Sequence, residues 1–302
     1  MITDRLIERI IEMQNPTCVG LDTHLDYLPD EMKAGAKTLA DAAARIVDFN
    51  KQLVDVLYDV VPSVKVQIAY YEAYGWAGLK AYKETLDYAA AKGLIVIADA
   101  KRNDIGSTAA CYSKAFLGES SINGNLDKAF PSDYLTVNGY LGTDGIAPFV
   151  EDCVKNDKGI FALVKTSNPS SGELQNLLLE NGKPVYEYMG ELVEKWGENT
   201  VGKYGYSAVG AVVGATHPEE AANLRGKMPH TFILIPGYGA QGGNAQMLKC
   251  CFKEDGLGGV VNNSRGIICA YKKNGGTFTE AARAAAIAMQ KYLTETIGKM
   301  GK

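Results

Sequence analysis

Charged side chains directly follow an apolar run in the stretch GLIVIADAKRNDIGST, which spans residues 93–108. An unsatisfied buried charge is costly, so a strand that passes from core into alternating charges either reaches solvent or builds a site. Because strand side chains alternate, Asp99 and Lys101 share a face, whereas Asp104 lies in the following turn and periodicity does not place it. The alternative for such a charged hexapeptide is a solvated loop with incidental charge pairing.

Other apolar runs also end in polar residues. Asp22 ends PTCVGLD, Lys65 lies within SVKVQIAY, and Lys165 and Ser167 stand at the end of GIFALVKTS. Taken singly, Asp22 could cap a helix and Lys65 could reach solvent along its apolar stem. Their common place at strand ends favours one shared site.

Two glycine-bearing segments, IPGYGAQGGN and NNSRGI, follow the last two apolar runs. Gly237, Gly239 and Gly242 match G-x-G-x-x-G, but a dinucleotide site would require an acid at the end of the next strand, which instead ends in VNNSR. Glycines that let the backbone approach an anion, together with the fixed charge of Arg265, favour a phosphate site. The alternative is a tight turn, with Arg265 paired to a surface acid.

The elements that must position these residues alternate along the chain. Eight apolar, β-branched runs predict strands at 16–22, 63–70, 93–100, 133–138, 159–165, 207–214, 230–237 and 258–266. Helical patterns fall at 1–13, 38–61, 78–92, 185–200, 217–227 and 279–297. This alternation predicts parallel strands with helical crossovers, and eight units suit a (β/α)8 TIM barrel better than an open sheet. We expect one domain over residues 1–302, with longer loops near 113–132 and 167–184.

Composition narrows the class of ligand. The 302 residues are 46% hydrophobic and 22% charged, with a net charge of −4 and no basic stripe. This indicates a globular protein without the electrostatic footprint of nucleic-acid or membrane binding, so a small molecule is expected. Residues 1–13 do not resemble a signal peptide, and no run approaches membrane-spanning length. Six cysteines without a C-x-x-C pair fit a reducing cytoplasm, and the adjacent Cys250 and Cys251 are interpreted as buried or incidental.

With D-x-K-x-x-D at 99–104 and P-G-x-G-A-Q-G at 236–242, the chain resembles the orotidine 5′-phosphate decarboxylases, in their longer bacterial-type subgroup. The resemblance spans nearly the whole chain and includes Asp22, Lys65, TSNP at 166–169 and S-R-G at 264–266. D-x-K-x-x-D alone is shared with phosphosugar decarboxylases and synthases of the same superfamily. The resemblance implies decarboxylation of orotidine 5′-phosphate to uridine 5′-phosphate and CO2 in pyrimidine biosynthesis, without a cofactor or metal.

The resemblance also implies a role for each matching residue. The catalytic residues would be Lys65, Asp99, Lys101 and Asp104, with Lys101 as proton donor to C6 of the pyrimidine. Asp104, Ile105 and Thr108 would reach into the partner subunit's site, which implies a homodimer. Asp22 and Lys65 would lie near the ribose hydroxyls and Ser167 near the pyrimidine. The substrate-binding set that it implies is Asp22, Ile105, Thr108, Ser167, Pro236, Gly237, Gln241, Gly242, Ser264 and Arg265, with Gln241, Gly242, Ser264 and Arg265 at the phosphate.

These residue types suit that reaction. Loss of carboxylate from C6 leaves a carbanion in the ring plane, where the π system cannot delocalise it. An ammonium fixed beside C6 stabilises the developing charge and can then protonate the carbon. Flanking carboxylates should keep Lys101 protonated despite burial.

Three other functions remain open from the residues alone. A Mg²⁺-dependent phosphosugar lyase would require acidic oxygen ligands, where Lys65 places positive charge. A Schiff-base aldolase could use Lys165 or Lys65, whose pKa an apolar pocket should then lower. A barrel that only binds a nucleotide or sugar phosphate is the non-enzymatic alternative, and the D-x-K-x-x-D motif argues against it.

Overall fold

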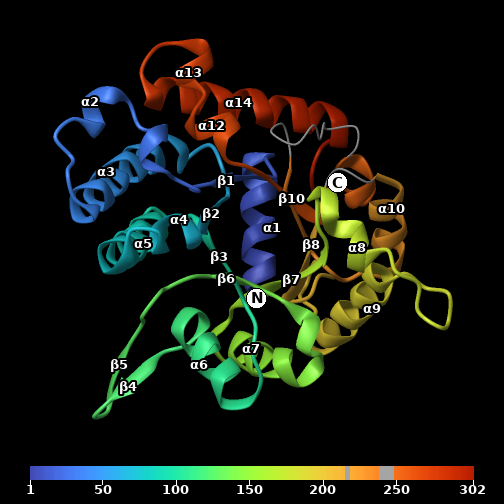
Figure 1. Cartoon of the computed structure of the whole chain (residues 1–302). Coiled ribbons are helices and arrows are strands. Elements are labelled where there is room, and N and C mark those ends of the chain that lie inside the picture. Colours follow the sequence, from blue (N-terminus) through green and yellow to red (C-terminus); the bar gives the residue numbers. More distant parts are fainter. Residues whose placement is uncertain (215–217, 238–247) are drawn as a thin grey trace.

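Eight parallel strands close into a barrel in the computed structural model, which describes residues 1–214, 218–237 and 248–302 (Figure 1). Around the barrel the order is β1-β10-β9-β8-β7-β6-β3-β2. The (β/α)8 barrel predicted from the sequence is therefore confirmed, with a barrel strand inside or overlapping each of the eight predicted runs. The strands are β1 (Thr17–Gly20), β2 (Ser63–Gln67), β3 (Ile95–Arg102), β6 (Tyr134–Val137), β7 (Gly159–Lys165), β8 (Val209–Val213), β9 (Ile233–Ile235) and β10 (Gly259–Asn263).

Helices surround the barrel and cover the outer face of its strands (Figure 1). Helices cover the outer face of each strand, and side chains of the other strands pack against its inner face. The residues of each strand are therefore apolar on both faces. The longer helices are α1 (Ile2–Met13), α3 (Leu39–Leu57), α5 (Gly75–Ala91), α6 (Gly106–Leu117), α7 (Thr143–Asn156), α9 (Val185–Gly197), α10 (Pro218–Lys227) and α14 (Phe278–Ile297). Single-turn helices are α2 (Asp30–Lys33), α4 (Ala69–Glu72), α8 (Gly172–Gln175), α12 (Arg265–Ile268) and α13 (Tyr271–Asn274).

The segment 113–132, expected as a long loop, is more ordered than the sequence indicated. Its first residues complete α6, and an antiparallel hairpin follows, formed by β4 (Ser120–Ile122) and β5 (Asn125–Asp127). The hairpin projects away from the barrel (Figure 1) and is mostly exposed, which explains why it lacks the apolar run of a barrel strand. In the segment 167–184, α8 forms one helical turn.

Helix α1 closes the end of the barrel at which the strands begin. Ile2, Leu6, Ile7 and Ile10 lie on one face of α1, fully buried against side chains inside the barrel. Thr3 on the same helix accepts a hydrogen bond from the Tyr134 hydroxyl and donates one to a backbone carbonyl, so its polar group is satisfied. This end of the barrel is filled, and the opposite end is left for a site.

Among the described residues, no helix is both long and apolar enough to cross a membrane.

A strand glycine lets the barrel pack closely between β7, β8 and β9, which yields a stability prediction. A Cβ on Gly210 would lie 2.5 Å from the Phe161 ring and 2.7 Å from the Phe232 carbonyl. We expect Gly210→Ala to lower the free energy of unfolding by about 1–3 kcal/mol, because overpacking forces neighbouring backbone to shift. Gly226→Ala is the matched control, since a Cβ there meets nothing within 4 Å. Denaturant unfolding measures both, and equal stability of the two variants would contradict the packing argument.

Candidate active site

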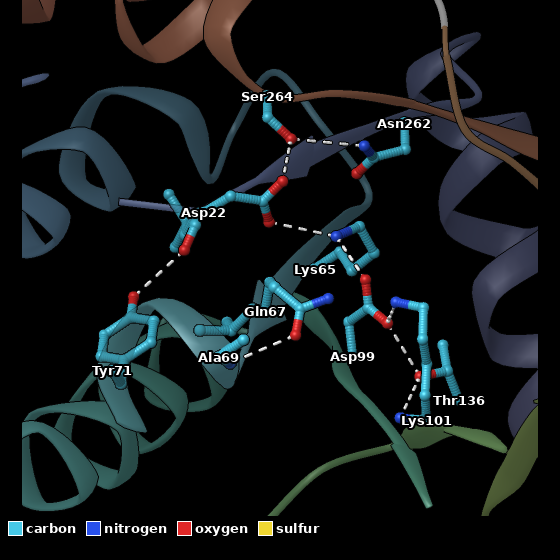
Figure 2. A network of polar contacts seen from close by, with 12 residues as sticks. Asp22, Lys65, Gln67, Ala69, Tyr71, Asp99, Lys101, Thr136, Asn262 and Ser264 are labelled. Carbon is cyan, nitrogen blue, oxygen red and sulfur yellow. Dashed lines mark hydrogen bonds and ion pairs between the residues drawn. The ribbon is translucent and has the colours of Figure 1, made fainter. Parts of the chain in front are cut away.

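Four charged side chains of alternating sign meet at the carboxyl ends of β1, β2 and β3 (Figure 2). The Lys65 ammonium lies 3.1 Å from Asp22 Oδ1 and 2.8 Å from Asp99 Oδ2. The Lys101 ammonium lies 2.6 Å from the other oxygen of that carboxylate, Asp99 Oδ1. The parallel register explains the meeting, because it pairs Gly20 with Lys65 and aligns β2 with β3.

Burial and neighbouring charges shift the pKa values of Asp99 and Lys65 in opposite directions. Burial alone would raise the pKa of Asp99, but the ammonium groups of Lys65 and Lys101 outweigh it and hold that pKa well below its usual range. Burial alone would lower the pKa of Lys65, but Asp22 and Asp99 outweigh it and raise that pKa above its usual value. Both groups are therefore charged at neutral pH.

The backbone at Lys101 departs from a regular strand. The register between β3 and β6 shifts between Ala98 and Arg102, and Lys101 has φ of 47°, a left-handed conformation that side chains other than glycine rarely adopt. Thr136 holds this turn, since its hydroxyl accepts from the Lys101 N–H at 2.9 Å and donates to Asp99 Oδ1 at 2.8 Å. The Lys101 side chain stays 46% exposed, so its ammonium remains accessible to a ligand.

Asp22 is also held from its other side, by the residue that follows β10, the second neighbour of β1 in the barrel. The Ser264 hydroxyl donates to Asp22 Oδ2 at 2.7 Å. A Cβ on Gly20 would fall 1.9 Å from Ser264 Oγ, so glycine at this position makes the contact possible. The Leu21 N–H donates to the Lys65 carbonyl at 2.8 Å, which extends the pairing of β1 and β2 up to Asp22.

A buried polar network supports the turn that carries Asp22. The Thr23 hydroxyl donates to the Asn50 side chain at 2.7 Å, and the Asn50 amide donates to the Tyr71 hydroxyl at 2.8 Å. That hydroxyl in turn donates to the Leu21 carbonyl at 3.1 Å (Figure 2). Because the members satisfy one another away from water, the network fixes the turn rather than weakening the core.

Three polar residues at the mouth were not singled out from the sequence. Thr136 lies within DYLTVN, Gln67 follows Lys65 by two residues, and Asn262 is the second-last residue of β10. Asn262 Oδ1 is buried and has no hydrogen-bond partner among the described residues, while its amide donates to Ser264 Oγ at 3.3 Å. The signal was present in all three, since each is a polar side chain near the carboxyl end of an apolar run.

The residues predicted at the phosphate end are only partly described. Pro236 and Gly237 directly follow β9, and Gly237 has φ of 91°. Arg265 begins α12, is exposed, and has no acidic partner in the parts of the chain that the structure describes. Gln241 and Gly242, like Gly239, lie outside the described residues.

The residues predicted to serve a neighbouring subunit lie together at the start of α6. Asp104 accepts a hydrogen bond from the Ile105 N–H at 2.8 Å and makes no ion pair with Lys101 of its own chain. Ile105 and Thr108 are exposed. The structure therefore brings Lys65, Asp99 and Lys101 together and leaves Asp104 apart from them.

Ser167 lies just beyond the end of β7, and Lys165 is the last residue of that strand. The Lys165 ammonium is bound by Asn176 and Glu220 and does not join the charged groups around Asp99. Cys251 is buried in the core and Cys250 packs against it, as expected. Within the described ranges, no three His, Cys, Asp or Glu side chains are grouped to hold a metal ion.

Comparison with known proteins agrees with this geometry. A family model described as "Orotidine 5′-phosphate decarboxylase / HUMPS family" matches residues 15–274. The orotidine 5′-phosphate decarboxylase of Clostridium perfringens is 44% identical over 99% of this chain and all of its own length. That of Clostridium acetobutylicum is 45% identical over 98% of this chain and again all of its own length.

The fold matches solved structures over a similar extent. The structure of Leishmania donovani OMP decarboxylase superposes with a TM-score of 0.74 at 28% identity, covering 98% of each chain. The barrel, the charged groups at its mouth and the full-length similarity agree, and the chain belongs to the orotidine 5′-phosphate decarboxylase family.

Proposed function

We propose that the protein decarboxylates orotidine 5′-phosphate to uridine 5′-phosphate and CO2 without a cofactor, and that Lys101 protonates C6. The observation that carries the proposal is the accessible Lys101 ammonium, bound at 2.6 Å to a buried carboxylate that Lys65 also binds. The curated relatives that match the chain over its full length carry the name of this activity.

In the proposed reaction the bond between C6 and the carboxylate carbon breaks, CO2 leaves, and the electron pair stays on C6. The Lys101 ammonium stabilises that pair by its charge and then donates a proton to it, which leaves a neutral amine that water reprotonates. Asp99 is the anchor, because its ionised carboxylate fixes the position of the ammonium before the substrate binds.

The rest of the substrate would extend from the charged groups to the other strand ends. We propose that Asp22 and Lys65 bind the ribose hydroxyls, that Ser167 contacts the pyrimidine, and that Arg265 binds the phosphate. Arg265 suits this role because it is exposed, follows Ser264 at the mouth, and has no acid to neutralise it among the described residues. Pro236, Gly237, Gln241, Gly242 and Ser264 complete the proposed phosphate end.

We also propose a homodimer in which Asp104 completes the partner's site. Support comes from Asp104, which forms no ion pair with a lysine among the described residues, and from apolar side chains exposed after neighbouring strands. Trp76 after β2, Ile105 after β3 and Tyr140 after β6 are 79%, 51% and 71% exposed. Such an apolar band at one rim of the barrel favours association with a second copy.

The alternative enzymes fit the charges less well. A lyase that binds Mg²⁺ between carboxylates would require the position between Asp22 and Asp99, which the Lys65 ammonium fills. A Schiff-base lysine requires a lowered pKa, whereas the carboxylates raise that of Lys65.

All six cysteines are free thiols, which supports a reducing, cytoplasmic location as part of the proposal.

The first prediction from the proposed function concerns the proton donor. We expect wild-type protein to deplete orotidylate absorbance in the presence of EDTA, and Lys101→Ala to lower kcat by at least about a hundred-fold, because the general acid is lost. Lys291→Ala removes an exposed lysine on α14 and should leave kcat unchanged. Absence of turnover by a folded wild-type dimer would instead favour a phosphosugar lyase or a binding protein, to be tested with phosphosugars and Mg²⁺.

The second prediction concerns the phosphate. We expect Arg265→Ala to lower kcat/KM by about a hundred-fold, because binding energy from the non-reacting phosphate positions the reacting end. Lys273→Ala is the control, since it removes a neighbouring exposed cation on α13. Steady-state kinetics decide the matter, and an unchanged kcat/KM in Arg265→Ala would reject the assignment.

The third prediction concerns the shared site. Lys101→Ala and Asp104→Ala should each be nearly inactive alone. Dimers re-formed from an equal mixture should recover about a quarter of wild-type activity, because about half of the dimers are mixed and one of the two sites in each mixed dimer is intact. Sedimentation or light scattering verifies the dimer. No recovery after verified subunit exchange would show that Asp104 acts within its own subunit.

A further inference from the structure

A second strand-end lysine, Lys165, is more deeply buried than any of the four charged groups at Asp22, Lys65, Asp99 and Lys101, and the proposed reaction does not use it. Its side chain is 1% exposed at the end of β7. The ammonium lies 2.5 Å from Asn176 Oδ1 and 3.3 Å from Glu220 Oε2, and 5.0 Å from the centre of the Tyr186 ring. A buried charge with three partners of this kind is retained at a cost in desolvation, which calls for a reason.

The partners of Lys165 come from different elements on one side of the barrel. Asn176 directly follows α8, Tyr186 belongs to α9 and Glu220 belongs to α10. In Figure 1 these three helices lie together beside β7 and β8. The ammonium therefore ties the connection that follows β7 to the helix that follows β8.

The same connection is closed a second time, next to Lys165. The Gln175 side chain accepts a hydrogen bond from the Thr166 N–H at 3.0 Å and donates one to the Thr166 hydroxyl at 2.7 Å. That hydroxyl also donates to Asn168 Oδ1 at 2.6 Å. Residues 165 and 166 are thus each bound to the far end of the segment, and Ser167 is the next residue along.

Ser167 is packed tightly against the end of β8. A Cβ on Gly214 would lie 2.9 Å from Ser167 Cβ and 3.0 Å from its backbone nitrogen. The Gly214 N–H donates to the Lys165 carbonyl at 2.8 Å, so the ends of the two strands are joined directly beneath Ser167. Any movement of the segment after β7 would therefore displace Ser167 at the barrel mouth.

We propose that Lys165 is a positioning residue that fixes Ser167 for contact with the pyrimidine and thereby sets recognition at that end of the substrate alone. The inference rests on the proposed function, in which Ser167 contacts the pyrimidine and Arg265 binds the phosphate. Lys165 acts through the segment 166–176 and touches neither the substrate nor the groups around Asp99. Loss of Lys165 should accordingly weaken binding of the pyrimidine end of the ligand and leave binding of the ribose phosphate end unchanged.

The test measures binding of two probes to the full-length protein, uridine 5′-phosphate and ribose 5-phosphate, which lacks the pyrimidine. In Lys165→Met, which keeps the apolar stem and removes the ammonium, we expect the Kd for uridine 5′-phosphate to rise about ten-fold. The Kd for ribose 5-phosphate should stay at the wild-type value. Orotidylate kcat/KM should fall in parallel with the affinity for uridine 5′-phosphate.

Lys158→Met is the matched control at the opposite end of the same strand. Lys158 directly precedes β7 and its ammonium lies 3.2 Å from Asp133 Oδ1, a pair of similar length far from the mouth. Its loss should change thermal stability without changing either Kd. Glu220→Gln, which keeps the volume of its side chain, repeats the test if Lys165→Met does not fold, with the same division between the probes.

Two results would overturn the inference while the proposed function stands. Equal weakening of both probes would show a general structural role, and unchanged binding of both would show no role in recognition. If wild-type protein bound uridine 5′-phosphate but did not turn over orotidylate, the proposed reaction would be rejected and the division between probes would still test Lys165. If wild-type protein did not bind uridine 5′-phosphate, both proposals would be rejected together.

Discussion

Two ammonium groups share the single buried carboxylate of Asp99, and the arrangement of the barrel mouth depends on this sharing. Burying Lys65 or Asp99 without a partner would carry a desolvation cost of several kcal/mol, on the order expected for one unpaired ion. In the order Asp22, Lys65, Asp99, Lys101, each charge has a neighbour of opposite sign. Because the buried Lys65 ammonium pairs with Asp99, that carboxylate stays ionised. Lys101 can then be half-exposed at the mouth while its ammonium is held in place by the other oxygen of Asp99.

The two ends of the barrel carry separate tasks. At the end where the strands begin, α1 fills the interior with isoleucine and leucine, and the buried Tyr134 hydroxyl is satisfied by donating to Thr3 of that helix. At the other end, polar side chains replace apolar ones within two residues of the carboxyl ends of β1, β2, β3, β6, β7 and β10. Close packing at the filled end holds the strands in register. That register pairs Gln67 with Asp99, so that Lys65, two residues earlier, reaches the Asp99 carboxylate with its side chain.

The sequence predicted the barrel well because buried parallel strands leave a plain signal, and it predicted the strand-end charges for the same reason. It did not predict α7, whose interior Pro148 interrupts the helical pattern, or the exposed hairpin of β4 and β5, which buries too little to require apolar residues. The left-handed backbone at Lys101 and the contact that Gly20 permits with Ser264 depend on neighbours far along the chain. No local pattern encodes such contacts.

Lys65 and Lys165 show why residue type at a strand end does not by itself define a role. Both are buried lysines near the carboxyl ends of their strands, and the sequence leaves either available as a nucleophile. Lys65 lies between two carboxylates inside the mouth, which keeps it charged and places it where a ligand would bind. Lys165 contacts α9 and α10 outside the ring of strands, where its charge holds a connection in place. The direction of the side chain, set by the register shift between β7 and β8 at Leu163 and Lys165, separates the two roles.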